Sequence, residues 1–254
     1  MLPDILAVIS GGLVGLVLGL LGGGGSILAV PLLLYLVGIE DTHVAIGTSA
    51  VAVAASALIN LGLHARKGTI KWPCAVVFAV SGSLGALAGA AIGKAVDGRK
   101  LLLAFALAMV GVGVSMLRRK SDAGDTDVRF SRRIAARLVP TGFATGMASG
   151  FFGIGGGFLI VPGLISAANM TMLHAVGSSL VAVTAFGATT AASYAFSGLV
   201  LWDVAGLFIV GGLAGGLVGQ GLGSVLAARK GALTRVFAVF IFITAAYIAW
   251  KALA

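Results

Sequence analysis

The sequence predicts an all-α integral membrane protein built from two homologous halves, each with a glycine-rich break. The chain has 254 residues, of which 59% are hydrophobic and 10% are charged, and its mean hydropathy is +1.12. A soluble domain of this length would need far more charged surface. Apolar runs near the length that crosses a bilayer, about 18 residues, recur along the chain. They cover residues 44–63, 75–93, 101–117, 204–228 and 236–250.

The two halves are related by an internal repeat. At a shift of 130 residues Gly68 coincides with Gly198 and Trp72 with Trp202, and upstream the shift becomes 131. The repeat predicts a first half over residues 1–117, a basic linker over 118–135 and a second half over 136–254. The other coinciding landmarks are Gly82, Gly85, Gly89 and Gly93 with Gly212, Gly215, Gly219 and Gly223, then Gly11, Gly15 and Gly19 with Gly142, Gly146 and Gly150, and Pro31 with Pro162.

Each half opens with an apolar stretch that glycines interrupt, over residues 5–37 and 136–165. The first stretch, about 33 residues, would be roughly 50 Å long as a single helix, and a hydrocarbon core is roughly 30 Å thick. Consecutive glycines cost about 1 kcal/mol each inside a helix relative to alanine, so the stretch breaks at residues 22–25. Two crossings and a re-entrant hairpin both remain open, and each crosses the membrane an even number of times. Three plain helices follow, so each half crosses an odd number of times and the halves are expected to be inverted.

The basic residues support this arrangement. The net charge is +9, but the lysines and arginines stand between apolar spans, where they set topology or contact anionic lipid. We therefore expect a lipid bilayer and no nucleic acid as partner. With the linker in the cytoplasm, inverted halves place a larger majority of basic residues inside than parallel halves do. This predicts a multi-pass membrane protein with both termini outside the cytoplasm.

Several functions lack the residues that they require. The acidic residues stand at span ends or in loops, which argues against a metal-cation pathway and leaves proton coupling without an obvious carrier. The single cysteine, Cys74, excludes an intramolecular disulfide and a CxxC metal site. No HExxH, GxSxG or phosphate-binding Gly-Lys-Ser/Thr motif is present. The sequence therefore predicts no enzyme, no metal and no cofactor.

The breaks themselves are the candidate binding site. Unwound backbone survives in a membrane only where protein buries it or where it lines a wet cavity, and helices that start after the breaks direct free N–H groups toward that space. Such helix N-termini bind anions. The alternative interpretation of the breaks is a structural kink. His43 and His174 are interpreted as polar residues at the membrane interface. The candidate binding residues are Gly22, Gly23, Gly24, Gly25 and Ser26 in the first break, Gly153, Gly155, Gly156 and Gly157 in the second, and the hydroxyl residues Thr48, Ser49, Ser178 and Ser179.

This doubled motif resembles the TauE/SafE family of membrane permeases, often called sulfite or sulfonate exporters. The resemblance covers nearly the whole chain. It rests on Leu20-Leu21-Gly22-Gly23-Gly24-Gly25-Ser26 before Val30-Pro31 and Gly47-Thr48-Ser49, and on Phe152-Gly153-Ile154-Gly155-Gly156-Gly157 before Val161-Pro162 and Gly177-Ser178-Ser179. The resemblance implies a bacterial transporter of the cell inner (cytoplasmic) membrane for a small sulfur-containing anion such as sulfite, sulfoacetate or another organosulfonate. The residues alone indicate only a small anion.

The function predicted from both arguments is a secondary transporter that works by alternating access. A passive anion channel and a non-catalytic membrane partner subunit are the alternatives. The oligomeric state stays open, a homo-oligomer included.

Overall fold

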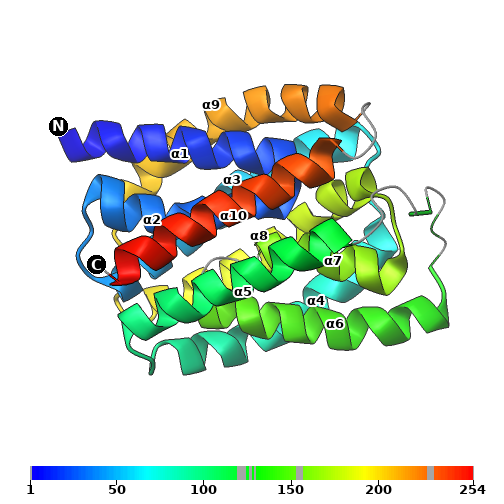
Figure 1. Cartoon of the computed structure of the whole chain (residues 1–254), viewed down its shortest axis with the longest axis horizontal. Helices are drawn as coiled ribbons and strands as arrows, with labels where there is room; N and C mark the ends of the chain where they lie inside the picture. The colour runs from blue at the N-terminus through cyan, green and yellow to red at the C-terminus, as the bar shows by residue number, and fades with distance from the viewer. Residues whose placement is uncertain are drawn as a thin grey trace.

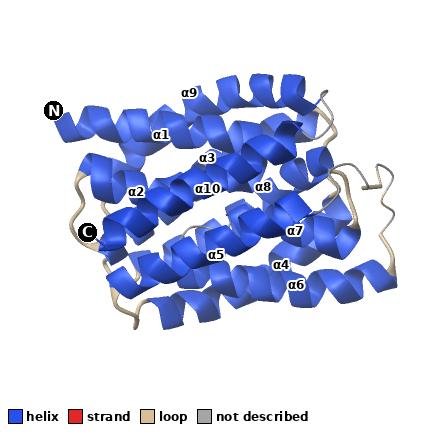
Figure 2. Ribbon diagram, viewed as in Figure 1, coloured by secondary structure: helices blue, strands red, loops and turns tan. Residues whose placement is uncertain are grey.

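The computed structural model describes residues 2–118, 124, 125, 128, 130–152, 157–227 and 232–253, and this part consists of helices joined by loops, with an isolated bridge between Asp125 and Met170 (Figures 1 and 2). The first half contains α1 Leu2–Leu21, the 3₁₀ segment η1 Gly22–Leu28, α2 Ala29–Leu32, the π-helical segment η2 Leu33–Val37, α3 Thr42–Arg66, α4 Trp72–Gly93 and α5 Gly98–Arg118. The second contains α6 Arg132–Phe152, α7 Gly157–Ala168, α8 Met172–Ala195, α9 Trp202–Ala227 and α10 Ala232–Leu253.

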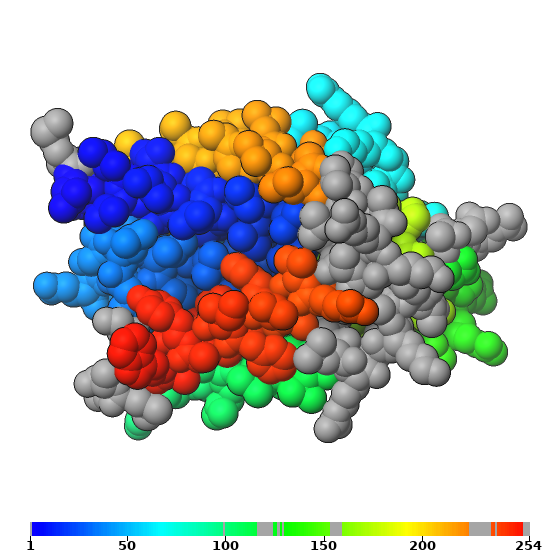
Figure 3. Space-filling model, turned by 45° about the horizontal axis from the view of Figure 1, so that its top comes forward, coloured from blue at the N-terminus to red at the C-terminus, as the bar shows by residue number. Residues whose placement is uncertain are grey.

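The helices have the length and composition of membrane spans. Within the described residues, five helical segments are long and apolar enough to cross a bilayer, namely Leu2–Val37, Thr42–Arg66, Trp72–Gly93, Met172–Ala195 and Trp202–Gly223. Large apolar side chains are exposed along α1, α9 and α10, among them Ile9, Val210 and Ile243. These three helices share the face seen in Figure 3. The prediction of an all-α integral membrane protein is confirmed.

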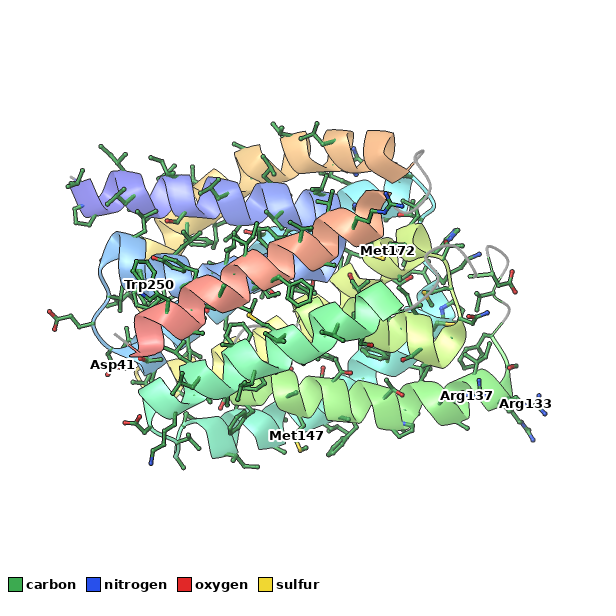
Figure 4. All side chains as sticks on the ribbon, in the orientation of Figure 1. Asp41, Arg133, Arg137, Met147, Met172 and Trp250 are labelled. Atoms are coloured by element: carbon green, nitrogen blue, oxygen red, sulfur yellow. The ribbon has the colours of Figure 1, made fainter. Side chains whose placement is uncertain are left out.

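The first interrupted stretch crosses the molecule and returns. The chain reverses at Gly22, whose φ of +64° lies in the left-handed region that favours glycine. Asp41, which follows the returning segment, lies at the same end of the molecule as the N-terminus (Figures 1 and 4). Residues 5–37 therefore enter and leave on one side, as the length argument predicted.

The long helices of one half pack mainly against long helices of the other half. The first helix of each half packs against the third long helix of the other, as α1 on α9 and α6 on α4, while α3 packs on α8 and α5 on α10. The contacts repeat in detail: a Cβ added at Gly15 would overlap the backbone of Gly212, and one added at Gly146 would overlap the backbone of Gly82. Both pairs coincide under the internal repeat. The glycines that recur every three or four residues on α1, α4, α6 and α9, here called the glycine strips, therefore allow these helices to pack with their backbones in close contact.

Equivalent caps end α3 and α8, which correspond under the repeat. Gly68 and Gly198 have φ of +67° and +71°. Equivalent hydrogen bonds close the helix that precedes each of them. Leu199 donates its N–H to the Tyr194 carbonyl at 3.0 Å, and Thr69 donates to the His64 carbonyl at 3.4 Å. This is the pattern of a Schellman cap, in which glycine takes the left-handed position.

The two ends of the molecule differ in what they carry. Both termini lie at one end, here called the terminal end, while the chain enters α6 at the opposite end, where Arg133 and Arg137 are labelled (Figures 1 and 4). We call that opposite end the linker end. α6 begins inside the predicted linker, because Ser131 caps it by accepting from Ile134 N–H at 3.3 Å.

Candidate functional site

The first glycine break is a buried hairpin that is bound to the other half of the protein. Gly22 to Ile27 are all buried. The Gly23 N–H donates to Ser179 Oγ on α8 at 3.0 Å, and Ser179 Oγ in turn donates to the Val176 carbonyl at 2.7 Å. In an uninterrupted α-helix the Gly23 N–H would donate to the Gly19 carbonyl. The break therefore redirects a backbone donor from α1 to α8.

Only glycine fits at the turn of this hairpin. A Cβ at Gly22 would lie 2.6 Å from the Val176 carbonyl oxygen and 2.7 Å from Ser179 Oγ, and its φ is positive. Ser26 stabilises the segment from within, since its Oγ donates to the Gly23 carbonyl at 2.9 Å. These contacts make the break a built feature of the fold rather than a loose kink.

The second break falls on residues that the structure leaves undescribed. Gly153, Gly155 and Gly156 lie outside the described residues, and Gly157 is where α7 begins. α7 packs against η1, so the helix that follows the second break lies beside the first break. The structure therefore brings the first break, α7 and Ser179 together in the interior.

The remaining predicted hydroxyl residues occupy other places. Thr48 Oγ1 accepts the Leu201 N–H at 3.0 Å, and Ser178 Oγ accepts the Lys71 N–H at 2.9 Å. These bonds are equivalent under the repeat, and they hold connecting loops at opposite ends of the molecule. Ser49 Oγ donates to Ile46 within its own helix at 2.8 Å. Of the four predicted hydroxyls, Ser179 is the one that the described residues show bonded to the first break.

The two histidines noted in the sequence lie at helix starts. Asp41 caps α3 by accepting from His43 N–H at 2.7 Å, and His174 Nδ1 lies 2.8 Å from Thr171 Oγ1 just before α8. Neither contact reaches the break.

A cleft of about 420 Å³ opens at the linker end, lined in part by Asp125, Arg137 and Asn169.

Sequence reasoning missed a row of buried polar groups on α3. Ser56, Asn60 and His64 are spaced four residues apart, so they share one face of the helix, and they are 0%, 1% and 5% exposed. Ser56 Oγ, Asn60 Oδ1 and His64 Nε2 have no hydrogen-bond partner within the described residues. A polar spacing of four in an otherwise apolar span was the available signal. We call Ser56, Asn60 and His64 the α3 row.

Glycines of α9 make room for this row. A Cβ at Gly216 would lie 2.7 Å from Asn60 Nδ2, and one at Gly212 would meet Ser56 Oγ. One turn further along α9, Gln220 Nε2 is also buried without a partner in the described part of the chain. Buried polar atoms in a membrane span are costly unless water or a ligand satisfies them, and they mark functional sites.

The second half carries a related but different row. Thr190 and Tyr194 on α8 occupy the positions of Asn60 and His64 under the repeat, and Thr190 Oγ1 and Tyr194 OH are also buried and unpartnered among the described residues. Beside them, Lys94 Nζ donates to Ser193 Oγ at 3.0 Å and lies 5.5 Å from the Tyr194 ring centroid. This second row lies toward the terminal end.

A bundle of apolar spans that buries an unwound glycine segment and two polar rows belongs to the class of membrane transport proteins. The comparisons with known proteins specify the family. Residues 7–248 match the family model described as sulfite exporter TauE/SafE, and the chain belongs to this family.

The relatives carry transporter names. The chain is 51% identical over 248 residues to a "probable membrane transporter protein" of Xylella fastidiosa, an alignment that covers 97% of this chain and 95% of the relative. It is 26% identical to the "probable membrane transporter protein YdhB" of Bacillus subtilis, over 82% of this chain and 85% of that protein. A "probable membrane transporter protein" of Haemophilus influenzae is 30% identical, over 76% and 74% of the two chains. No solved structure matches the chain.

Proposed function

We propose that this membrane transporter is a secondary transporter of a small anion, sulfite or an organosulfonate, and that it works by alternating access in the cell inner membrane. The observation that carries the proposal is the first break, which is buried, bonded through Gly23 to Ser179 of the other half, and packed beside α7. α7 is a 12-residue helix, long enough for its first turn to direct N–H groups and a positive dipole end toward an anion.

The arrangement of the halves supports alternating access. α1 starts at the terminal end and α6 at the linker end, so equivalent helices run in opposite directions (Figures 1 and 4). We therefore propose that the repeats are inverted in the bilayer, with the basic linker end in the cytoplasm. A bond between the break of one half and α8 of the other lies where rocking of the halves would open or close the site.

Transport by the purified protein in liposomes tests this proposal. We expect saturable uptake of radiolabelled sulfite or sulfoacetate, with counterflow against unlabelled substrate inside. The variant Ser179→Ala should lose most of this uptake, and the matched control Ser178→Ala, which alters a hydroxyl one residue away at a loop contact, should retain more of it. Uptake of neither anion above that of empty liposomes would overturn the proposal. Flux that never saturates and shows no counterflow would indicate a channel instead.

A further inference from the structure

The buried α3 row contains a group that can bind a proton, and no feature of the candidate anion site uses it. His64 is 5% exposed, although it stands only two residues before Arg66, where α3 ends. Ser56 and Asn60 continue the row toward the middle of the membrane, and Gln220 of α9 lies beside it. These side chains present four buried polar atoms without a partner in the described residues, a setting in which water satisfies such atoms and in which imidazole is the one group that can bind a proton near neutral pH.

The contacts of His64 define which ring nitrogen is available. Thr69 Oγ1 lies 3.0 Å from His64 Nδ1 and donates its own proton to the His64 carbonyl at 3.3 Å. Thr69 therefore holds Nδ1, whichever of the two atoms carries the hydrogen of that contact. Nε2 is the ring nitrogen that has no hydrogen-bond partner within the described residues.

His64 is also connected to α8 near the break. A Cβ at Gly177 would lie 2.6 Å from Thr69 Oγ1, so the partner of His64 Nδ1 is pressed against α8. Gly177 is two residues before Ser179, which holds Gly23. A change in the charge of His64 therefore acts on groups that also position the break.

The charged residues that follow His64 most closely in the chain are basic. Arg66, Lys67 and Lys71 follow it at the linker end. Among the described side chains of the elements packed against α3, the ionisable groups are Asp4 on α1, Tyr35 on η2, Lys100 on α5, His174 and Tyr194 on α8, and Asp203 on α9. His174 is the member of this set that lies at the linker end, where Thr171 bonds it. No described carboxylate faces His64 to hold it permanently charged.

We propose that His64 Nε2 is the proton-binding site of a proton-coupled anion transporter, with Ser56, Asn60 and Gln220 forming the hydrated path beside it. This inference rests on the proposed function. Nε2 takes a proton from hydronium and releases water, and the imidazolium gives the proton back to water on the other side of the cycle. Histidine suits this role because its unperturbed pKa allows it to change charge between pH 5 and 8. One such residue in one half predicts one proton per anion.

The experiment separates exchange of the anion from its coupling to protons. Proteoliposomes with the membrane potential clamped at zero receive labelled sulfoacetate, whose charge is constant above about pH 6. With one proton per anion, an inward gradient of about one pH unit supports about tenfold accumulation. We expect the wild-type protein and the control His174→Gln to reach this tenfold accumulation of sulfoacetate. His64→Gln should show counterflow without pH-driven accumulation.

The outcomes distinguish this inference from the proposed function. No counterflow by wild-type protein would overturn the proposed function. Counterflow in wild type with no response to the pH gradient, or pH-driven accumulation by His64→Gln equal to that of wild type, would overturn the role of His64. If His64→Gln is not monodisperse, the variant His64→Asn replaces it, and the affinity of the wild-type protein for sulfoacetate is measured as a function of pH. This affinity should rise as pH falls. An affinity that does not change with pH would refute the inference.

Discussion

Replacing Gly146 by alanine tests whether the glycine strips hold the two halves together. A Cβ at Gly146 would overlap the backbone of Gly82, and backbone cannot move away by changing rotamer. Overpacking of this kind costs typically 1–3 kcal/mol, and we take about 3 because α4 and α6 must separate. Alanine regains about 1 kcal/mol of helix propensity. The net loss is then about 2 kcal/mol, or about 4–8 °C in melting temperature for a chain of this size.

The matched control is Gly111→Ala on α5. Nothing lies within 4 Å of a Cβ at that position, so the variant should gain the propensity term alone, about 1 kcal/mol, and melt about 2–4 °C higher. The measurement is thermal unfolding of the purified protein in one detergent, followed by tryptophan fluorescence. Gly15→Ala, the equivalent change on α1 against Gly212, should cost as much as Gly146→Ala. Equal melting temperatures for Gly146→Ala and Gly111→Ala would refute the packing argument.

Three further results are expected. Ser179→Ala leaves a buried amide of the first break without its acceptor, so it should destabilise the protein by about 1–3 kcal/mol in the same unfolding assay, and an unchanged melting temperature would contradict that bond. Gly68→Ala and Gly198→Ala each place a Cβ in the left-handed region, so both should cost about 1–2 kcal/mol and by similar amounts; a difference of several kcal/mol would contradict the equivalence of the two caps. In a cysteine-free background, a cysteine at Glu40 should react with an impermeant maleimide in intact cells and one at Ser131 should not, and the reverse labelling would invert the proposed orientation.

Sequence predicted the spans and the break because both depend on local physical chemistry. Length and apolarity define a span, and consecutive glycines cannot stay helical at low cost. The packing partners were not readable in the same way. The glycine spacing shows that α4 has a smooth face, but it does not say that α6 covers it, since any helix with a matching face would satisfy the pattern. The exchange of helices between the halves needed the structure.

The site was less predictable than the fold. Gly23 was expected to line an anion site, and the structure shows its N–H bonded to Ser179. Thr48 and Ser178 were expected near the breaks, and they hold connecting loops instead. A hydroxyl in a sequence carries no sign of which amide it will meet across the bundle. Those partners come from segments 107 to 156 residues away.

His64 shows the opposite error. In the sequence His64 stands just before Arg66 and Lys67. That position suggests the solvated end of a span and gives no sign that the residue could carry a proton. The row is buried where α9 packs against α3, since a Cβ at Gly212 would meet Ser56 and one at Gly216 would meet Asn60. A residue of this kind can be found from sequence only by asking which polar residues share a helix face, and Ser56, Asn60 and His64 meet that test.

The repeat makes the divergence between the rows informative. The backbone of the two halves is kept alike, down to the caps at Gly68 and Gly198, while His64 in one half corresponds to Tyr194 in the other. A phenol does not change charge near neutral pH, and an imidazole does. Near Tyr194 the positive charge is instead carried by Lys94, held by Ser193 Oγ at 3.0 Å. Two halves that exchange roles during transport would be equivalent if their rows were the same. Under the proposed proton coupling, His64 gives the described row at the linker end a charge that depends on pH, and Thr190 and Tyr194 give the other row no such charge near neutral pH. We therefore expect the two orientations of the transporter to respond differently to pH.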